Sequence, residues 1–336
     1  MEYTDDIKTI AALELPWEKL EGANVLVTGA TGLIGGCLID ALMCRTHRNY
    51  HVYAVGRNVK RAQKRFSRYI GDALFHFLEY DVQKPCIFDF QVDYIIDAAS
   101  NASPNAFVET PVEIMKSNIV GLANLMDFGI KHGLKRLLFV STGEIYGEGD
   151  GRVFTEDYSG YVDTMSPRSC YPSSKRAAET LCVAYAQEYD VDVVVARLSH
   201  TYGPQYTEYD NRVYAQFIRN VIAGEDIVMK SKGEQFRSWC YVVDSVKGLL
   251  YVLLKGEKGE AYNIADQTSN ISIKELAEMI AKIGCRKVVF DIPPEIEQKG
   301  YNVVKKSVFD TRKIERLGWS ISGTMEEKLM AMFGVA

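Results

Sequence analysis

Two residues four apart in the sequence, Tyr171 and Lys175, have the chemistry to move a proton. We expect a helix over residues 171–189, and residues four apart lie on the same face of a helix. The ammonium of Lys175 would favour the phenolate of Tyr171 and lower its pKa from about 10. Such a tyrosine can take a proton from a hydroxyl group, and Thr142, just after a strand expected at 137–140, could hydrogen-bond the same hydroxyl.

A glycine-rich turn follows the first apolar run, at residues 25–27. Glycines stand at positions 29, 32 and 35, and an apolar helical pattern begins at Leu33. Gly29 would permit the turn, Gly32 would let the backbone approach a pyrophosphate, and Gly35 would let the helix pack close to the strand. The helix N-terminus would offer unpaired N–H groups to that phosphate. The residues of this predicted dinucleotide site are Gly29, Thr31, Gly32, Leu33, Ile34 and Gly35.

Strands and helices alternate along the first two thirds of the chain, and the strands are apolar enough to be buried on both faces. This pattern predicts an α/β fold, a doubly wound parallel sheet of the Rossmann type. The expected strands cover residues 25–27, 51–55, a segment ending at 80–82, 94–99, 137–140 and 191–196, with helices at 111–131 and 171–189.

Beyond Gly203-Pro204 the pattern becomes irregular and predicts a smaller C-terminal α/β lobe over the carboxyl ends of the strands, where ligands bind in such sheets. Its expected elements are helices near 212–223, 244–255 and 272–283 and strands near 227–229, 239–243 and 261–264. In the N-terminal extension, Asp5 or Asp6 could cap a short helix that covers the edge of the domain. The predicted division is an extension at 1–22, a dinucleotide-binding domain at 23–200 that includes the catalytic helix, and a mainly substrate-binding lobe at 201–336.

The composition excludes several classes of partner. A net charge of −5 gives no basic field for nucleic acid or an anionic membrane. No apolar run approaches the ~20 residues that span a bilayer, and the acidic N-terminus lacks the regions of a signal peptide. The seven cysteines are odd in number and no pair has metal-binding spacing, so we expect reduced thiols in the cytoplasm and no metal site.

The segment after the second strand leaves the choice of cofactor open. NAD-binding folds often place a carboxylate here to hold the adenosine ribose, but this chain has Gly56-Arg57-Asn58. Arg57 could instead meet the 2′-phosphate of NADP, or it could simply be solvated. Arg57 also begins a basic run through Arg68 with helical spacing, which is typical of a solvated face.

Taken together, these motifs resemble those of the extended short-chain dehydrogenase/reductases that modify nucleotide sugars, over roughly residues 23–320. The resemblance implies NAD as cofactor, with Asp81 and Val82 at the adenine, Ala98, Ala99 and Ser100 at the nicotinamide half, and Asn118 also on the cofactor side. It implies Thr142, Tyr171 and Lys175 as the catalytic trio. It also implies that Arg237 holds the diphosphate of the substrate, with His200 and Arg212 as further substrate-side residues. The segments that carry it are 29–35, 81–82, 98–100, 118, 142–147, 171–175, 197–204 and 235–244.

Within this family the chain is most similar to UDP-glucuronate decarboxylases, by residues 99–104, 155–180, 210–218 and 237–241. Two positions depart from their usual pattern: Gly143 stands where they have serine, and His200 where they have asparagine. The similarity to dTDP-glucose 4,6-dehydratases is weaker, because Gly143 replaces the aspartate that serves those enzymes as an acid. Glu144, two residues past the threonine, suits chemistry at C5, either as a base or as a positioning group.

We therefore expect a nucleotide-sugar enzyme that acts on a UDP-sugar and works through a 4-keto intermediate. Decarboxylation comes first among the reactions, with 4-epimerisation and 4,6-dehydration as alternatives. An NADP-dependent reductase is a further alternative because of Arg57. A dinucleotide-sensing regulator fits poorly, because Thr142, Tyr171 and Lys175 are all present. Related enzymes form dimers through the helix expected at 171–189 and usually serve surface polysaccharide synthesis, so a homodimer with such a role is expected here.

Overall fold

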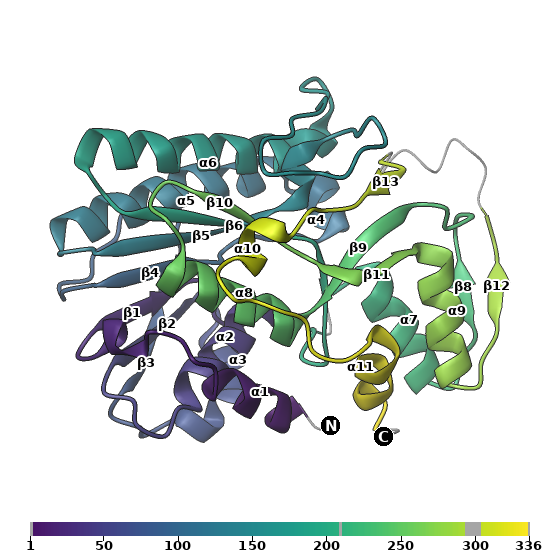
Figure 1. Cartoon of the computed structure of the whole chain (residues 1–336), viewed down its shortest axis with the longest axis horizontal. Coiled ribbons are helices and arrows are strands. Elements are labelled where there is room, and N and C mark those ends of the chain that lie inside the picture. The colour runs from purple at the N-terminus through teal and green to yellow at the C-terminus, as the bar shows by residue number, and fades with distance from the viewer. Residues whose placement is uncertain (1–2, 208–209, 293–303, 335–336) are drawn as a thin grey trace.

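The computed structural model describes residues 3–207, 210–292 and 304–334, and it confirms the predicted fold class (Figure 1). Its main layer is a seven-stranded sheet in the order β10-β6-β5-β4-β1-β2-β3, in which all neighbouring strands are parallel. Six of these strands follow the order of a doubly wound dinucleotide-binding sheet. The strands are β1 (Asn24–Val27), β2 (His51–Gly56), β3 (Phe75–Glu79), β4 (Tyr94–Asp97), β5 (Arg136–Thr142), β6 (Val193–Leu198) and β10 (Ala261–Ile264).

Helices cover both faces of this sheet because alternate side chains of each strand point to opposite sides. The main helices are α1 (Tyr3–Ala11), α2 (Leu33–Met43), α3 (Val59–Arg65), α4 (Pro104–Glu109), α5 (Pro111–Lys131), α6 (Cys170–Tyr189) and α8 (Val242–Lys255). Val25 and Val27 of β1 pack in a core cluster with α2 and α8, whereas Leu26 packs in a second cluster with α5 and α6. Short 3₁₀ turns lie at η1 (Trp17–Leu20), η2 (Ser67–Tyr69), η3 (Gly143–Tyr146) and η4 (Pro167–Ser169). Within the described residues, no helix is both long and apolar enough to cross a membrane.

The C-terminal third forms the smaller lobe, at the right of Figure 1, but also returns to the large sheet. The strand expected at 261–264 is present as β10, yet it pairs with β6 and extends the main sheet. The strand expected at 239–243 begins earlier, and the third strand of the main sheet ends earlier, at Glu79. The lobe contains β7 (His200–Tyr202), α7 (Val213–Ile222), β8 (Ile227–Met229), β9 (Phe236–Tyr241), β11 (Asp266–Ser272), α9 (Ile273–Ile283), β12 (Val288–Phe290) and β13 (Lys306–Ser307), and the chain continues through α10 (Arg312–Glu315) and α11 (Met325–Met332).

A buried carboxylate corrects part of the prediction that the basic run is a solvated face: Arg57, Lys60, Lys64 and Arg68 are exposed, but Arg65 is largely covered. Asp40 of α2 is fully buried, and it forms ion pairs with Arg65 and, at 2.5 Å, with Arg68. A buried carboxylate needs such partners, so Arg65 turns inward, whereas Arg68 reaches Asp40 from the surface with 44% of its side chain exposed. The N-terminal helix adds Tyr3, whose hydroxyl donates to Asp40 at 2.6 Å. This helix begins at Tyr3, so Asp5 and Asp6 lie in its first turn and do not cap it.

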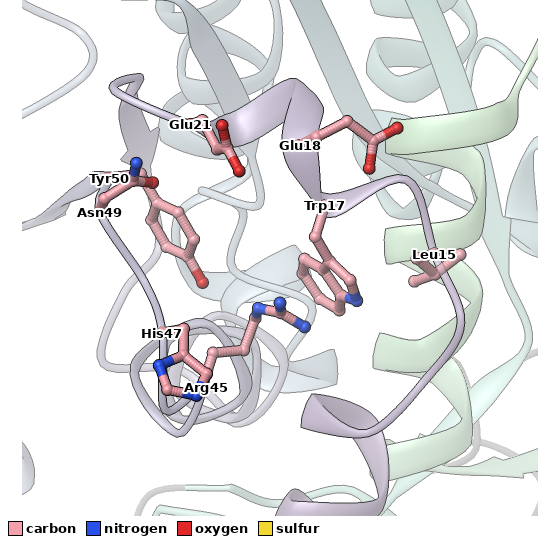
Figure 2. A pocket seen from close by; sticks show the side chains of 8 residues that line it. All are labelled: Leu15, Trp17, Glu18, Glu21, Arg45, His47, Asn49 and Tyr50. Atoms are coloured by element: carbon pink, nitrogen blue, oxygen red, sulfur yellow. The ribbon is translucent and has the colours of Figure 1, made fainter.

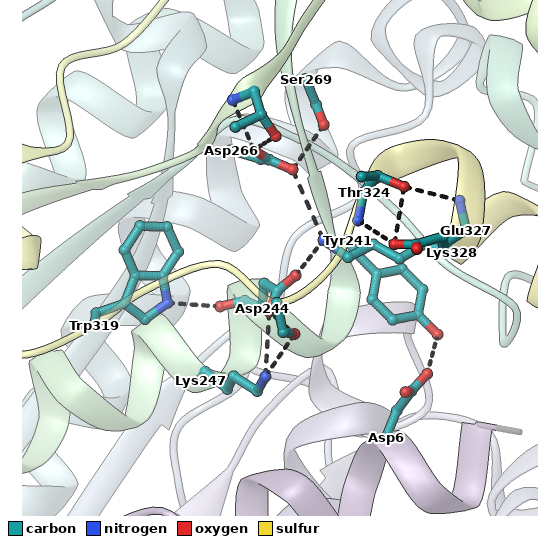
Figure 3. Close-up of polar contacts among 12 residues, drawn as sticks. Asp6, Tyr241, Asp244, Lys247, Asp266, Ser269, Trp319, Thr324, Glu327 and Lys328 are labelled. Atoms are coloured by element: carbon teal, nitrogen blue, oxygen red, sulfur yellow. Dashed lines mark hydrogen bonds and ion pairs between the residues drawn. The ribbon is translucent and has the colours of Figure 1, made fainter. Parts of the chain in front are cut away.

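A second buried cluster joins the two ends of the chain to α8 (Figure 3). The carboxylate of Asp244 lies 2.7 Å from Lys328 Nζ of α11 and 3.3 Å from Lys247 Nζ. The hydroxyl of Tyr241 donates to Asp6 at 2.9 Å. Tyr241 and Asp244 belong to the segment 235–244 that resembles the nucleotide-sugar enzymes, and these contacts give both residues a structural role.

Candidate active site

The turn after β1 has the geometry that its glycines predict. Gly29 has a φ of +62°, and a Cβ there would lie 2.3 Å from the carbonyl oxygen of Ala98. A Cβ on Gly35 would lie 2.4 Å from the carbonyl oxygen of Gly29, so α2 does pack close to the turn. Gly32 is the N-cap of α2 and has no side chain to occupy the space before the helix. Leu33 and Ile34 are the first helical residues, and the carbonyl of Thr31 accepts from Arg61 Nη2 at 3.0 Å.

Thr28 and Asp97, which the sequence analysis did not select, form a hydrogen-bonded pair next to the glycine turn. Thr28 Oγ1 donates to Asp97 Oδ1 at 2.6 Å and accepts from the backbone N–H groups of Ala98 and Ala99, both at 3.1 Å. Burial raises the pKa of Asp97, against the opposing charge of Lys175. The available signal was two polar residues at the carboxyl ends of buried apolar strands.

The residues present fit a bound dinucleotide. The glycine turn leaves a cradle that a Cβ would fill, and Ser100 Oγ is buried without a hydrogen-bond partner in the described part of the chain. At the carboxyl ends of β2 and β3, Arg57 and Asp81 line a hollow of about 400 Å³. Arg57 is exposed, and Val82 is buried against α5 at Gly121. The other residues that line this hollow are Gln83, Lys84, Glu113, Lys116 and Val120.

A second hollow, of about 310 Å³, lies elsewhere (Figure 2). Its residues 45–50 directly precede β2, so it lies at the amino ends of the parallel strands, opposite the edge where such sheets bind ligands. The guanidinium of Arg45 covers the ring of Trp17 there, 4.1 Å from its centroid. None of the predicted site residues lines it.

Tyr171 is buried at the start of α6, beside Thr142 and Glu144. Its ring stacks on Phe107 with centroids 4.8 Å apart. Burial raises the pKa of Tyr171 above its usual value and the charge of Glu144 raises it further, whereas hydrogen bonding with Thr142 and the charges of Arg212 and Arg168 lower it. The expected lowering is therefore wrong for the protein without ligands, because desolvation of the phenolate outweighs the cations.

Lys175 is buried and hydrogen-bonded to the neighbouring strand. Its Nζ donates to the carbonyl oxygen of Val140 on β5 at 2.8 Å. Burial lowers the pKa of Lys175 to about 8, against the attraction of Asp97 and Glu179. The ammonium therefore stays mostly charged at neutral pH. It lies between α6, which carries Lys175 and Tyr171, and β5, the strand that carries Thr142.

This shifted pKa predicts how stability depends on pH. Between pH 8 and the ordinary lysine pKa of 10.5, Lys175 is neutral in the folded chain and charged in the unfolded one. The unfolded state then binds more protons, so the free energy of unfolding contributed by Lys175 rises with pH across this window, by at most about 3 kcal/mol. We expect Lys175→Met to remove this rise, as measured by urea unfolding of ligand-free protein at pH 7 and pH 10. Equal pH slopes in the two proteins would contradict the prediction.

Glu144 forms an ion pair with a residue that the sequence analysis did not select. Arg168 Nη2 lies 3.1 and 3.0 Å from the two carboxylate oxygens of Glu144. The same guanidinium covers the ring of Phe107 at 4.5 Å, next to Tyr171. The available signal was a cation three residues before Tyr171, inside the segment that resembles the decarboxylases.

The predicted substrate-side residues gather next to this pair. Arg237 of β9 is buried, and its Nη1 lies 2.9 Å from His200 Nε2. Burial lowers the pKa of Arg237 to about 10, while Glu144 raises it and Arg168 lowers it further. Arg212 is held by Asp210 at 2.5–3.2 Å, and its charge lowers the pKa of both Tyr171 and His200. The structure thus brings Arg168 and Arg212 near Tyr171, and Arg237 near Glu144 and Arg168.

Asn118 of α5 contacts α6, the helix that carries Tyr171 and Lys175. Its Nδ2 donates to Ser174 Oγ of α6 at 2.8 Å, and its Oδ1 is buried without a partner among the described residues. The contact joins α5 to the turn of α6 between Tyr171 and Lys175. A positioning role for α6 is visible in this geometry, and the cofactor-side role of Asn118 stays a prediction.

A phenylalanine explains why Gly143 departs from the pattern of the decarboxylases. A Cβ at Gly143 would lie 1.9 Å from Cζ of Phe309. Phe309 is 1% exposed and packs with Ile145, Tyr146 and Phe154. The ring occupies the space that a side chain at position 143 would need.

We expect Gly143→Ser to lower the free energy of unfolding by about 1–3 kcal/mol, because overpacking forces a buried ring to move. Urea unfolding would measure this loss. Phe309→Leu in the same chain should reduce the additional cost of the serine, since the two positions are in contact. An equal cost in both backgrounds would show that the ring is not the cause.

Comparisons with known proteins agree with the fold described above. A family model described as the NAD dependent epimerase/dehydratase family matches residues 25–265. The chain belongs to this family. Members of the family are NAD-dependent enzymes, so the predicted enzyme class and cofactor are confirmed.

Individual members of the epimerase/dehydratase family are similar along nearly the whole chain. UDP-glucuronic acid decarboxylase 6 of Arabidopsis thaliana is 32% identical over 317 residues, which cover 92% of this chain and 87% of the relative. A UDP-glucose 4-epimerase of Thermotoga maritima, solved with UDP-glucose, is 26% identical with a TM-score of 0.77 and coverages of 93% and 98%. A UDP-glucuronic acid 4-epimerase of Bacillus cereus, solved with UDP-glucuronic acid and NAD, shares the fold at 22% identity, a TM-score of 0.77 and coverages of 93% and 98%.

Proposed function

We propose that this enzyme decarboxylates UDP-glucuronate through a 4-keto intermediate and keeps its NAD between turnovers. The observation that carries the proposal is the group of three guanidinium ions, of Arg168, Arg212 and Arg237, beside Tyr171 and Glu144. A sugar nucleotide whose sugar is a uronate has negative charge on its diphosphate and at C6, and guanidinium groups suit both. The similarity to a UDP-glucuronic acid decarboxylase over 92% of the chain supports the same substrate.

The chemistry balances without a net redox change. NAD held by the glycine turn and Ala98–Ser100 would supply the acceptor for a hydride from C4 and the donor for its return to the same carbon. Tyr171 takes the proton of the C4 hydroxyl, Thr142 holds that oxygen, and the charge of Lys175 favours the phenolate. The C4 ketone accepts the electron pair of the breaking C5–C6 bond, so CO2 leaves. C5 then takes one proton from solvent, and Tyr171 returns its own proton to the C4 oxygen.

The state of Glu144 favours decarboxylation over the alternative reactions. A 4,6-dehydratase needs a base at C5, but both carboxylate oxygens of Glu144 lie within hydrogen-bond distance of Arg168. We therefore assign Glu144 as a positioning group, with Arg168 beside the sugar carboxylate. A 4-epimerase needs only the tyrosine, threonine and lysine, so it would leave this ion pair without a role.

The experiment that tests the proposal is mass spectrometry of purified protein mixed with UDP-glucuronate, without added cofactor. We expect a UDP-pentose and released CO2, and Tyr171→Phe serves as the inactive control. A UDP-4-keto-pentose would support decarboxylation with weak return of hydride. Unchanged UDP-glucuronate from protein that carries NAD would overturn the proposal. A UDP-galacturonate product, separated from the substrate by chromatography, would instead show epimerisation.

We propose that the adenosine half of NAD lies against Arg57, Asp81 and Val82, and the nicotinamide half against Ala98–Ser100. Arg57 is exposed and stands where NAD-binding folds often carry an acid, so an NADP-dependent reductase is the alternative that this proposal must exclude. Denaturing the protein after gel filtration and identifying the released dinucleotide separates the two. Retained NAD supports a self-recycling enzyme, and a protein that is empty or carries NADP favours the reductase.

We also propose a cytoplasmic homodimer. The seven cysteines are all free, as in a reducing compartment. The outer faces of α5 and α6 expose Met115 and Val183, which suit a helix-to-helix contact between two copies. Light scattering during gel filtration would give twice the chain mass of 37.8 kDa.

We propose that residues 23–200 mainly hold the cofactor and that residues 201–336 mainly hold the sugar nucleotide. Surface polysaccharide synthesis is the biological role that we propose.

A further inference from the structure

A partly buried contact between Arg237 and His200 has no role in the proton and hydride transfers described above. β7 pairs in parallel with β9, with His200 opposite Trp239. Arg237 lies two residues before Trp239 and therefore on the same face of β9. His200 packs 5.4 Å from the ring of Trp239, and its Nε2 lies 2.9 Å from Arg237 Nη1.

The chemistry of the two side chains fixes the state of the imidazole. A guanidinium has only N–H donors, so Nε2 of His200 must accept and the ring proton must lie on Nδ1. A doubly protonated ring would have no acceptor to offer. Burial and the charges of Arg237 and Arg212 hold the pKa of His200 well below its usual value, which agrees with a neutral ring.

Arg237 has little else to orient it. Among the described residues, His200 Nε2 is the hydrogen-bond acceptor that the structure gives to its guanidinium. The nearby carboxylate of Glu144 is held by Arg168. Without His200, a buried cation would be free to turn toward other acceptors.

We infer that neutral His200, held as its Nδ1–H tautomer, is a positioning residue that aims the Arg237 guanidinium at the diphosphate of the substrate. This inference rests on the proposed function, because it concerns the same sugar-nucleotide site. It gives a role to one of the two positions at which this chain departs from the decarboxylases that it resembles. Asparagine, their usual residue there, ends one atom short of Nε2, whereas glutamine places an amide oxygen at the position of Nε2.

The first test reads the tautomer directly. The chain has five histidines, so ¹⁵N-histidine labelling gives few signals, and His200→Gln assigns the one of interest. At pH 7.5 we expect the Nδ1–H pattern for His200 in the wild-type protein and its loss in Arg237→Met. An Nε2–H pattern in the wild-type protein would overturn the inference, whether or not the enzyme decarboxylates anything.

The second test uses UDP itself as the ligand, in calorimetric titrations of protein with its cofactor retained. His200→Phe keeps a ring beside Trp239 but removes the acceptor, and we expect its Kd for UDP to rise about tenfold, as for one lost hydrogen bond to a charged group. His200→Asn should weaken UDP binding similarly, and His200→Gln should recover most of the affinity. With a turned-over substrate, KM should change more than kcat.

The outcomes separate the two proposals. Equal UDP binding by the wild-type protein and His200→Phe would overturn the positioning role. The expected order of variants in a protein that leaves UDP-glucuronate unchanged would overturn the proposed reaction and retain the role of His200. Thermal unfolding of each variant checks that a loss of affinity is not a loss of fold.

Discussion

Tyr171→Phe is expected to lower turnover by about 10²–10⁴-fold, the usual contribution of a positioned acid–base group. The change removes one hydroxyl and keeps the ring, so the stacking on Phe107 at 4.8 Å should persist. The hydroxyl is the proton acceptor that we assign to the C4 oxygen, and no other phenol lies beside Thr142 in the contacts of the described residues. Single-turnover measurements with UDP-glucuronate, following the absorbance of the reduced cofactor, would report the loss at the oxidation step.

Tyr185→Phe is the matched control, since it removes a hydroxyl from the same helix. Tyr185 donates to Asp127 at 2.6 Å on the outer side of α6. We expect its turnover to stay within about twofold of the wild-type value. Retained NAD and an unchanged melting temperature in Tyr171→Phe would show that the chemistry alone was lost. Turnover near the wild-type rate would show that another group accepts the proton.

The raised pKa of Tyr171 bears on how the enzyme limits its own reactivity. Desolvation keeps the phenol protonated in the protein without ligands. The ammonium of Lys175, and the positive charge of an oxidised nicotinamide, would favour the phenolate only when the site is assembled. Sequence spacing predicted the partners but not the sign of the shift, because that sign depends on burial, and burial is a property of the packed fold.

Local patterns predicted the elements of the fold well. The alternation of apolar runs with helical periodicity predicted the parallel sheet, and the glycine spacing predicted the turn at Gly29 and the close packing at Gly35. Pairing between distant segments was not predictable in this way. β10 joins the main sheet because Ile264 pairs with Leu198, a contact between residues far apart in the chain.

The candidate site was likewise predictable where local patterns indicate it, and not where distant segments meet. Residue types near the ends of strands indicated Thr142 and Ser100, since carboxyl ends of parallel strands meet at one edge. The ion pair of Glu144 with Arg168 could not be read from spacing, because the two residues lie in separate 3₁₀ turns that only the folded chain brings together. Likewise, Arg65 looked like a surface cation until the fold placed Asp40 beneath it.

Arg237→Met is expected to weaken substrate binding and, in the ligand-free protein, to raise the free energy of unfolding. In the assembled site, the guanidinium is the group that we assign to the diphosphate, and losing a buried charged contact of this kind costs about 2–5 kcal/mol of binding. We expect kcat/KM to fall by about 10²–10³-fold, mainly through KM. Steady-state kinetics with UDP-glucuronate would measure this change. Arg312→Met, which removes an exposed guanidinium paired with Asp310, is the matched control.

Without ligand, the same substitution should make the protein more stable. Burial lowers the pKa of Arg237 to about 10, which means that the fold keeps this cation at a cost while no anion is bound. A methionine of similar length removes that cost, so the free energy of unfolding should rise by about 1–3 kcal/mol in urea. A residue kept only for packing would lower stability when replaced, and Arg237→Met with weaker binding and lower stability together would fit that structural role. Weaker binding with higher stability would instead identify Arg237 as a cation that the fold holds ready for its substrate.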